Sequence, residues 1–161
     1  MNSQTRVLEK EDIPDLVDFL SDPLVDSEFV KPLSQRSQSI EERVNYYYYY
    51  NGFWLIAIDN DKFYACVAVA YDKDEELASI STSYISPDYR KDDFYKGFIE
   101  DCIDKSIELY NPKAIIVDSW KGNKNVDRLG ERLGFKIIDE YEDTEKRPEG
   151  VKTVVYRLDL R

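Results

Sequence analysis

Residues 123–135 read NKNVDRLGERLGF, and this stretch indicates how the surrounding chain folds. It predicts a helix from about Val126 to Leu133 that stops at Gly134, since glycine readily takes the left-handed conformation that follows a helix. Just before it, residues 114–117 are short and wholly apolar, as expected of a strand buried on both faces of a sheet. A buried strand that leads into a helix is typical of an α/β arrangement.

Patterns on both sides of this unit complete the order of elements. A helical apolar stripe follows Pro14, a capping box at Ser39 and Glu42 opens a second helix, and residues 92–110 carry a third broad apolar face. Strands are predicted at residues 7–8, 53–58, 63–71, 77–85, 114–117, 136–141 and 153–160. The sequence therefore predicts one mixed α/β (α+β) domain over residues 1–161, in the order β-α-α-β-β-β-α-β-α-β-β.

Charge and hydropathy restrict the partners. The 161 residues include 22 Lys and Arg against 33 Asp and Glu, a net charge of −11. Such a field repels phosphate backbones and attracts amines and basic peptides, so we expect no nucleic acid and a cationic partner. The alternative is that the acidity only keeps the surface solvated. No apolar stretch reaches the roughly 20 residues of a membrane span, and no signal peptide is evident, so we expect a cytoplasmic chain without membrane contact.

Missing residue types exclude several chemistries. The chain has no histidine, which excludes Ser-His-Asp and Cys-His nucleophile systems and the common zinc sites, so no metal is expected. Its two cysteines, Cys66 and Cys102, lie in apolar periodic segments and are predicted to be small core residues. No glycine spacing matches a dinucleotide-binding or P-loop fingerprint.

Two motifs carry a family resemblance. Residues 123–135 are similar to the N-x-x-A-x-x-x-Y-x-x-x-G-F helix of the GNAT superfamily of acyl-CoA-dependent N-acyltransferases, and residues 84–90, YISPDYR, resemble its V-x-P-x-x-R motif. With the order of elements, the resemblance implies a GNAT-like fold. It also implies transfer of an acetyl group from the co-substrate acetyl-CoA to a primary amine of a small molecule or peptide, by direct attack. A homodimer is an open alternative to a monomer.

The resemblance also implies where acetyl-CoA binds. Strands four and five of the family splay apart, so that backbone groups of strand four, here at Ser83, Tyr84 and Ile85, pair with the pantetheine arm. The pyrophosphate lies on the following loop and helix start. The corresponding cofactor-binding residues are Arg90, Lys91, Asp92, Asp93, Phe94 and Tyr95, with Asn123 and Arg128 nearer the nucleotide.

The sequence departs from the family pattern at three positions. Asp93 and Tyr95 replace the two loop glycines, and Gly130 replaces a tyrosine that, in many members, protonates the departing thiolate. These losses support the alternative of a noncatalytic binding or regulatory module on the same scaffold.

Side chains that could take over the catalytic roles are few. Tyr84 and Tyr141 are candidates for the missing acid. Glu76, which precedes the fourth strand, is a candidate base or else a plain turn residue. In the tyrosine run at residues 46–50, Tyr47 and Tyr48 fall on the apolar stripe and are expected in the core, while the other three could line the acceptor side.

Overall fold

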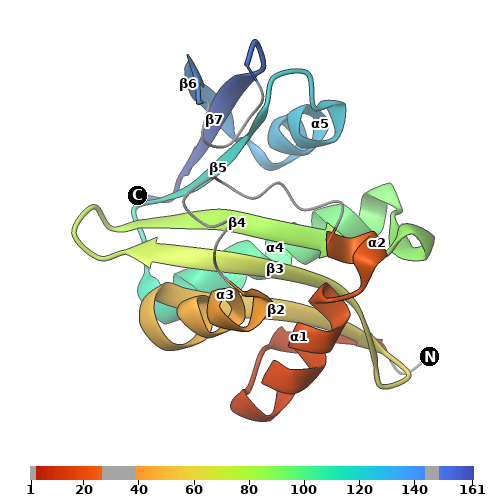
Figure 1. Ribbon diagram of the computed structural model, residues 1–161. Coiled ribbons are helices and arrows are strands. Elements are labelled where there is room, and N and C mark those ends of the chain that lie inside the picture. Colours follow the sequence, from red (N-terminus) through yellow and green to blue (C-terminus); the bar gives the residue numbers. More distant parts are fainter. Residues whose placement is uncertain (1–2, 27–38, 144–148) are drawn as a thin grey trace.

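The computed structural model describes residues 3–26, 39–143 and 149–161, which form an open seven-stranded sheet with helices on both faces (Figure 1). The strands are β1 Ser3–Val7, β2 Gly52–Asp59, β3 Lys62–Asp72, β4 Leu77–Ile85, β5 Ala114–Trp120, β6 Lys136–Glu142 and β7 Lys152–Asp159. The helices are α1 Ile13–Leu20, α2 Pro23–Asp26, α3 Ile40–Tyr46, α4 Asp92–Tyr110 and α5 Lys124–Leu133. This confirms the predicted fold class and order, to which the structure adds the four-residue helix α2.

The sheet order is β1-β2-β3-β4-β5-β7-β6, and β4 and β5 are its parallel pair. All other neighbouring strands run antiparallel. The long helix α4 connects β4 to β5, which is the crossover that a parallel pair requires. From the sequence, the long helical segment 92–110 between the strands predicted at 77–85 and 114–117 leads us to expect these two strands side by side and parallel, and the structure confirms this.

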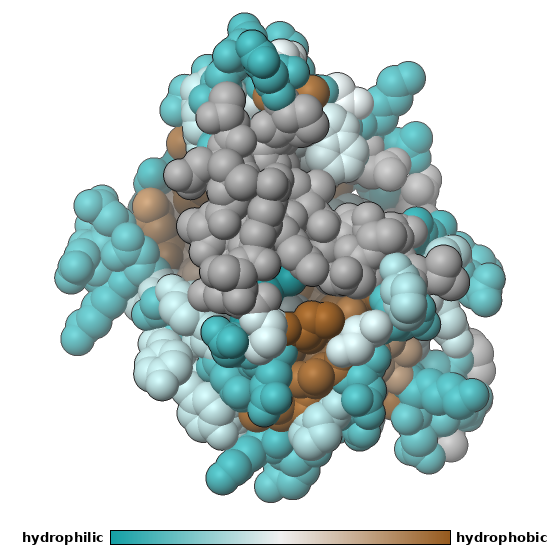
Figure 2. Space-filling view, in the orientation of Figure 1, coloured by the Kyte–Doolittle hydropathy of each residue, from teal (hydrophilic) through white to brown (hydrophobic). Residues whose placement is uncertain are grey.

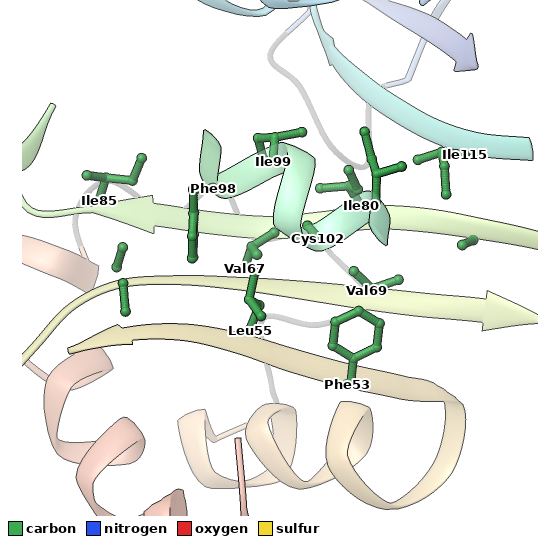
Figure 3. Packing of buried hydrophobic residues seen from close by; sticks show 14 of the residues in the cluster. Phe53, Leu55, Val67, Val69, Ile80, Ile85, Phe98, Ile99, Cys102 and Ile115 are labelled. Carbon is green, nitrogen blue, oxygen red and sulfur yellow. The ribbon is translucent and has the colours of Figure 1, made fainter. Parts of the chain in front are cut away.

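One core lies between the sheet and α4. Phe98, Ile99 and Cys102 of α4 pack against side chains that alternate along the central strands, including Leu55 and Val67 (Figure 3). Burial raises the pKa of the Cys102 thiol to about 12, as expected of an inert core cysteine.

A second core lies on the opposite face, under α1 and α3. Leu16 and Val44 of these helices pack against Trp54 and Ile56, the alternate residues of β2. Cys66 is fully buried in the same cluster, so the prediction that both cysteines belong to the core is confirmed. Because β2 and β3 are covered on both faces, their sequences read as continuous apolar runs.

Two further observations concern the hydropathy of the molecule. In Figure 2 the face that carries α1 and α3 has hydrophilic residues around its rim and an apolar area between them. None of the helices in the described part of the chain combines the length and the apolar character needed to cross a membrane.

Candidate functional site

The parallel pair opens partway along its length. The last paired residues are Ile80 of β4 and Val117 of β5. Beyond them β5 continues beside β7 as far as Trp120, while β4 continues for residues 81–85, here called the open segment, with no described strand on its β5 side. Figure 1 shows β5 rising away from β4. Ser81 and Ser83 are exposed although β4 is a central strand, because the neighbouring strand has left.

A β-bulge marks the start of the open segment. Val69 lies opposite Ile80 but Val67 lies opposite Ser83, so two residues of β4 face one residue of β3. As a result Ile80 and Ile85 both pack in the core under α4, although a regular strand would place them on opposite faces. The bulge also turns the Tyr84 side chain toward α1, where it meets the Phe19 ring at a centroid distance of 5.7 Å.

Backbone directions in the open segment follow from one hydrogen bond. The Ser86 N–H donates to the Tyr64 carbonyl of β3 at 2.7 Å. Since backbone groups alternate in direction along a strand, those of Tyr84 face β3, whereas those of Ser83 and Ile85 face the open side. The expectation that the backbone of Tyr84 also faces the opening is therefore wrong, and Ser83 and Ile85 supply those groups.

Aromatic contacts anchor the loop that follows β4. The turn Pro87–Tyr89 places the Tyr89 ring on Tyr64, with centroids 4.0 Å apart, and its hydroxyl donates to Asp59 at 2.9 Å. This hydrogen bond to a carboxylate raises the pKa of Tyr89. The Arg90 Nε donates to the Ile85 carbonyl at 2.7 Å, beside the open segment. The loop therefore brings a guanidinium next to the opening and delivers the chain to the start of α4.

The first turn of α4 follows directly. Lys91 is its N-cap, and the N–H groups of Asp92, Asp93 and Phe94 are those that a helix leaves without an intrahelical partner. The helix dipole places partial positive charge at the same end. Loop and helix start thus combine N–H donors with the cations of Arg90 and Lys91, a set suited to an anion.

The side chains at the two lost glycine positions have different surroundings. The Asp93 side chain is 99% exposed and lies 3.8 Å from Arg132. Tyr95 packs against the core under α4, where burial raises its pKa and a contact with the Ser83 side chain opposes that shift. Phe94 also turns inward, 5.3 Å from the Tyr64 ring. Of the two residues that replace glycines, Tyr95 thus belongs to the core under α4, and Asp93 keeps its carboxylate in solvent beside Arg132.

A different side chain fills the space beside Gly130. A Cβ atom built there would meet the Tyr156 ring of β7 at 3.4 Å. The Tyr156 hydroxyl donates to Asp127, and burial together with this bond raises the pKa of Tyr156. The hydroxyl of Tyr156 is thus directed at the Asp127 carboxylate of α5.

The predicted residues of α5 have different surroundings. Asn123 is the N-cap residue, and its Nδ2 donates to Ser119 Oγ at the end of β5 at 2.8 Å. Arg128 is exposed on the helix. Asn123 therefore joins β5 to α5, and the assignment of both residues to acetyl-CoA stays a prediction.

Two candidate catalytic residues lie away from the opening. Glu76 precedes β4 at its closed end, where it pairs with Lys113 at 2.8 Å and Arg161 at 3.2 Å. The bond from Lys113 lowers the pKa of Glu76, as for an ion-paired turn residue. The premise that Glu76 lies near the splay is wrong, because the eight residues to Tyr84 span about 26 Å of strand. Tyr141 lies on the edge strand β6, separated from β5 by β7, so it too is displaced from the opening.

The sequence prediction missed one contact at the opening. The hydroxyls of Tyr47 and Ser81 are 2.9 Å apart. Tyr47 was expected only as a core residue, and its ring is indeed buried. The alternation of serines along β4 was the available signal, but no local pattern reveals a contact between residues 34 positions apart. Across the described ranges, His, Cys, Asp and Glu side chains nowhere gather in threes that could hold a metal ion.

Solved structures that share this fold include acetyltransferases of the GNAT family. One from Streptococcus pneumoniae matches with a TM-score of 0.78 at 17% identity, over 99% of this chain and 100% of that one. The yncA protein of Salmonella typhimurium, solved with its cofactor acetyl-CoA, matches with a TM-score of 0.77 at 13% identity, over 100% and 95%. The ribosomal-protein-S18-alanine N-acetyltransferase of Escherichia coli matches with a TM-score of 0.68 at 16% identity, over 98% and 94%.

The sequence itself matches no family model and no curated protein. The chain nevertheless has the GNAT fold over nearly its whole length, as its two motifs predict. At sequence identities of 13–17%, this structural similarity defines the fold of the chain. A fold by itself does not define an activity, which depends on the residues at the opening between β4 and β5.

Proposed function

We propose that the protein is an acyl-CoA-dependent N-acetyltransferase that uses acetyl-CoA as its acyl donor. The observation that carries this proposal is the open segment of β4, which leads through an anchored loop into the N-terminus of α4. An exposed strand edge can pair with an amide-bearing chain, and a helix start can bind a phosphate. Pantetheine and pyrophosphate are connected in that order in acetyl-CoA.

Each part of the opening has a role in this proposal. The backbone groups of Ser83 and the N–H of Ile85 pair with the pantetheine amides, while the Ile85 carbonyl holds Arg90, and the first-turn N–H groups of α4, with Arg90 and Lys91, hold the pyrophosphate. The amine attacks the thioester carbon, a C–N bond forms and the C–S bond breaks. A backbone N–H on the open side stabilises the oxyanion. The thiolate has a pKa near 8.5, so it can leave without a tyrosine at Gly130.

We propose a cationic primary amine, of a small molecule or a peptide, as the acceptor. We place the acceptor on the face that carries α1 and α3. The net charge of −11 supports a cationic acceptor, as do exposed carboxylates on this face, such as Glu41 and Glu42 in the first turn of α3. An acidic field raises the local concentration of cations.

A noncatalytic binding module is the second candidate. The observation in its favour is the Tyr156 ring beside Gly130, with its hydroxyl bonded to Asp127. A module of this kind would bind acetyl-CoA through the same backbone groups but would not turn it over.

Two measurements separate these candidates. A ligand that binds only the folded chain stabilises it, by about 2.7 kcal/mol at a hundred times its Kd, so acetyl-CoA should raise the melting temperature. Thiol release from acetyl-CoA is then followed with a panel of primary amines. Amine-dependent release supports the enzyme, and a thermal shift without release supports the module. The absence of a thermal shift would contradict both candidates.

A further inference from the structure

A tyrosine–serine hydroxyl pair lies where β4 leaves β5, on the face that α1 and α3 cover. The hydroxyl oxygens of Tyr47 and Ser81 are 2.9 Å apart. Ser81 directly follows Ile80, the last residue of β4 that pairs with β5, and it is exposed. Tyr47 is only 6% exposed. A buried ring therefore brings its hydroxyl to an exposed serine at the first position of the open segment.

Packing fixes the position of the Tyr47 hydroxyl. The Tyr47 ring meets the rings of Tyr46 and Trp54 edge to face, at centroid distances of 5.3 and 5.5 Å. The Trp54 indole in turn donates to the Val44 carbonyl of α3 at 3.1 Å. Tyr47 also begins the π-helical turn Tyr47–Asn51, a distortion that is frequent at functional sites. The hydroxyl pair is thus built on a rigid support.

The pair leaves Ser81 well suited to meet an N–H group. A serine hydroxyl has one donor and two lone pairs, and either oxygen of this pair can be the donor. When Ser81 donates to Tyr47, both lone pairs of its Oγ are available for an incoming N–H. The backbone of Ser83 faces the open side two residues further on, which is at most about 7 Å along the strand. In the proposed complex the thioester carbonyl lies between the two, and productive attack requires the amine nitrogen about 3–3.5 Å from its carbon.

We propose that Ser81 Oγ binds the N–H of the attacking amine, and that Tyr47 is the positioning residue that holds Ser81 for this contact. The inference rests on the proposed acetyl transfer. The ammonium of the acceptor first gives a proton to water; the nitrogen lone pair then forms the C–N bond to the thioester carbon, and the electron pair of the C–S bond leaves with sulfur. The surplus proton on nitrogen passes to water, and water protonates the thiolate. Ser81 orients the amine throughout and forms no bond to carbon.

The test uses the full chain with three probe amines: spermidine, glucosamine and a tripeptide that begins with alanine. The variants are Ser81→Ala and Tyr47→Phe, alone and combined, and Ser81→Thr, which keeps the hydroxyl. Ser79→Ala is the matched control for serine, since Ser79 lies on the same face but pairs with Ile116 in the closed part of the sheet. Tyr48→Phe is the control for tyrosine. The acetyl-CoA Kd, and kcat and KM for each amine, are measured for every variant.

We expect Ser81→Ala and Tyr47→Phe each to lower kcat/KM for the best amine about tenfold, the loss of one hydrogen bond to a nitrogen that becomes positively charged as the C–N bond forms. The double variant should lose no more than either single variant, because both act through one contact. The acetyl-CoA Kd should stay unchanged, and Ser81→Thr should recover most of the activity. Melting curves check that each variant folds. If Tyr47→Phe does not fold, the comparison of Ser81→Ala with Ser81→Thr tests the inference, because Ser81 is exposed and its substitution should leave the fold intact.

Several outcomes would overturn the inference. Either single variant within twofold of the wild type would do so, as would an equal loss in Ser79→Ala or additive losses in the double variant. If these results accompany normal acetyl-CoA binding and turnover by the wild type, the proposed function stands and this inference falls alone. A wild-type chain that binds no acetyl-CoA, or that acetylates none of the three amines, overturns both.

Discussion

At the residue scale, Gly130 and Tyr156 form a complementary pair. The ring of Tyr156 occupies the space that a large side chain at Gly130 would need, and its hydroxyl is committed to Asp127. The glycine therefore leaves room for the Tyr156 ring between α5 and β7. A tyrosine introduced at this position would compete with the Tyr156 ring for the same space.

The first prediction contrasts two changes at Gly130. Gly130→Ala should stabilise the fold by about 0.5–1 kcal/mol, because alanine is the better helix former and its Cβ meets only ordinary contacts. Gly130→Tyr should destabilise it by about 1–3 kcal/mol through overpacking against Tyr156. Urea unfolding measures both changes. A Gly130→Tyr variant as stable as Gly130→Ala would show that Tyr156 moves aside freely.

The second prediction concerns Asp93, whose carboxylate is solvated at the start of α4. Asp93→Gly should tighten acetyl-CoA binding no more than about threefold, since a solvated charge is strongly screened, and high salt should remove the gain. The same change should cost about 0.3–1 kcal/mol of stability, because a first-turn carboxylate favours the helix dipole. Calorimetry at two salt concentrations tests the binding, with Asp104→Asn, further along α4, as the control. Weaker binding in Asp93→Gly would show that the aspartate does not oppose the phosphates.

At the scale of elements, two polar contacts join neighbouring segments around the sheet. Asn123 at the start of α5 donates to Ser119 at the end of β5 at 2.8 Å, and Ser119 is buried. At the N-terminus, Arg6 of β1 donates twice to Asp12, just before α1. Each contact sets how a helix leaves the sheet.

The third prediction tests the link between β5 and α5. Asn123→Ala should lower the free energy of unfolding by about 1–2 kcal/mol, because it leaves the buried Ser119 hydroxyl without this partner. The double variant with Ser119→Ala should lose less than the sum of the two single changes, since they share one bond. Denaturant unfolding measures both, with Lys124→Ala as the exposed neighbouring control. Additive losses would contradict a direct link.

The fourth prediction gives the pH dependence of the contact between Arg6 and Asp12. The hydrogen bond from Arg6 lowers the pKa of Asp12, so the contact stabilises the fold above the unfolded pKa of about 3.9 and is lost as pH falls through the folded value. Asp12→Asn should cost about 0.5–1 kcal/mol at pH 7, since the pair is partly exposed, and the difference from wild type should shrink below about pH 4. Unfolding at several pH values measures it, with Asp18→Asn as the control. A constant difference down to pH 2 would contradict the assignment.

At the scale of the whole molecule, the excess of acidic residues is the dominant property, with a net charge of −11. Its long-range field acts on any ligand that approaches the sheet opening. Two effects are therefore opposed in the proposed reaction, because the same field attracts a cationic amine and repels the phosphates of acetyl-CoA. The donors at the start of α4 act against that repulsion at short range.

The fifth prediction is the salt dependence that follows. The kcat/KM of a cationic amine should exceed that of a neutral amine at low salt, and the advantage should fall several-fold at high salt as the Debye length shrinks from about 8 Å at physiological salt to about 3 Å at 1 M. The measurement is an acceptor panel at two salt concentrations. If cationic amines have no advantage, or one that salt leaves unchanged, the charge acts only on solubility.

The amino-acid sequence alone determined the order of elements, the end of α5 at Gly134, the buried cysteines and the parallel pair of β4 and β5. The order of elements and the buried cysteines depend on local periodicity, and the end of α5 depends on a single glycine. The parallel pair follows from the long helix between the two strands, because a crossover of this length joins parallel strands. The tertiary structure alone decided three others: the bulge that turns Tyr84 toward α1, the Tyr156 ring beside Gly130, and the contact between Tyr47 and Ser81. One inserted residue reverses the alternation of a strand, and the two contacts join residues more than 20 positions apart. No local sequence pattern encodes the bulge or the two contacts, because all three depend on how the whole sheet and its helices pack.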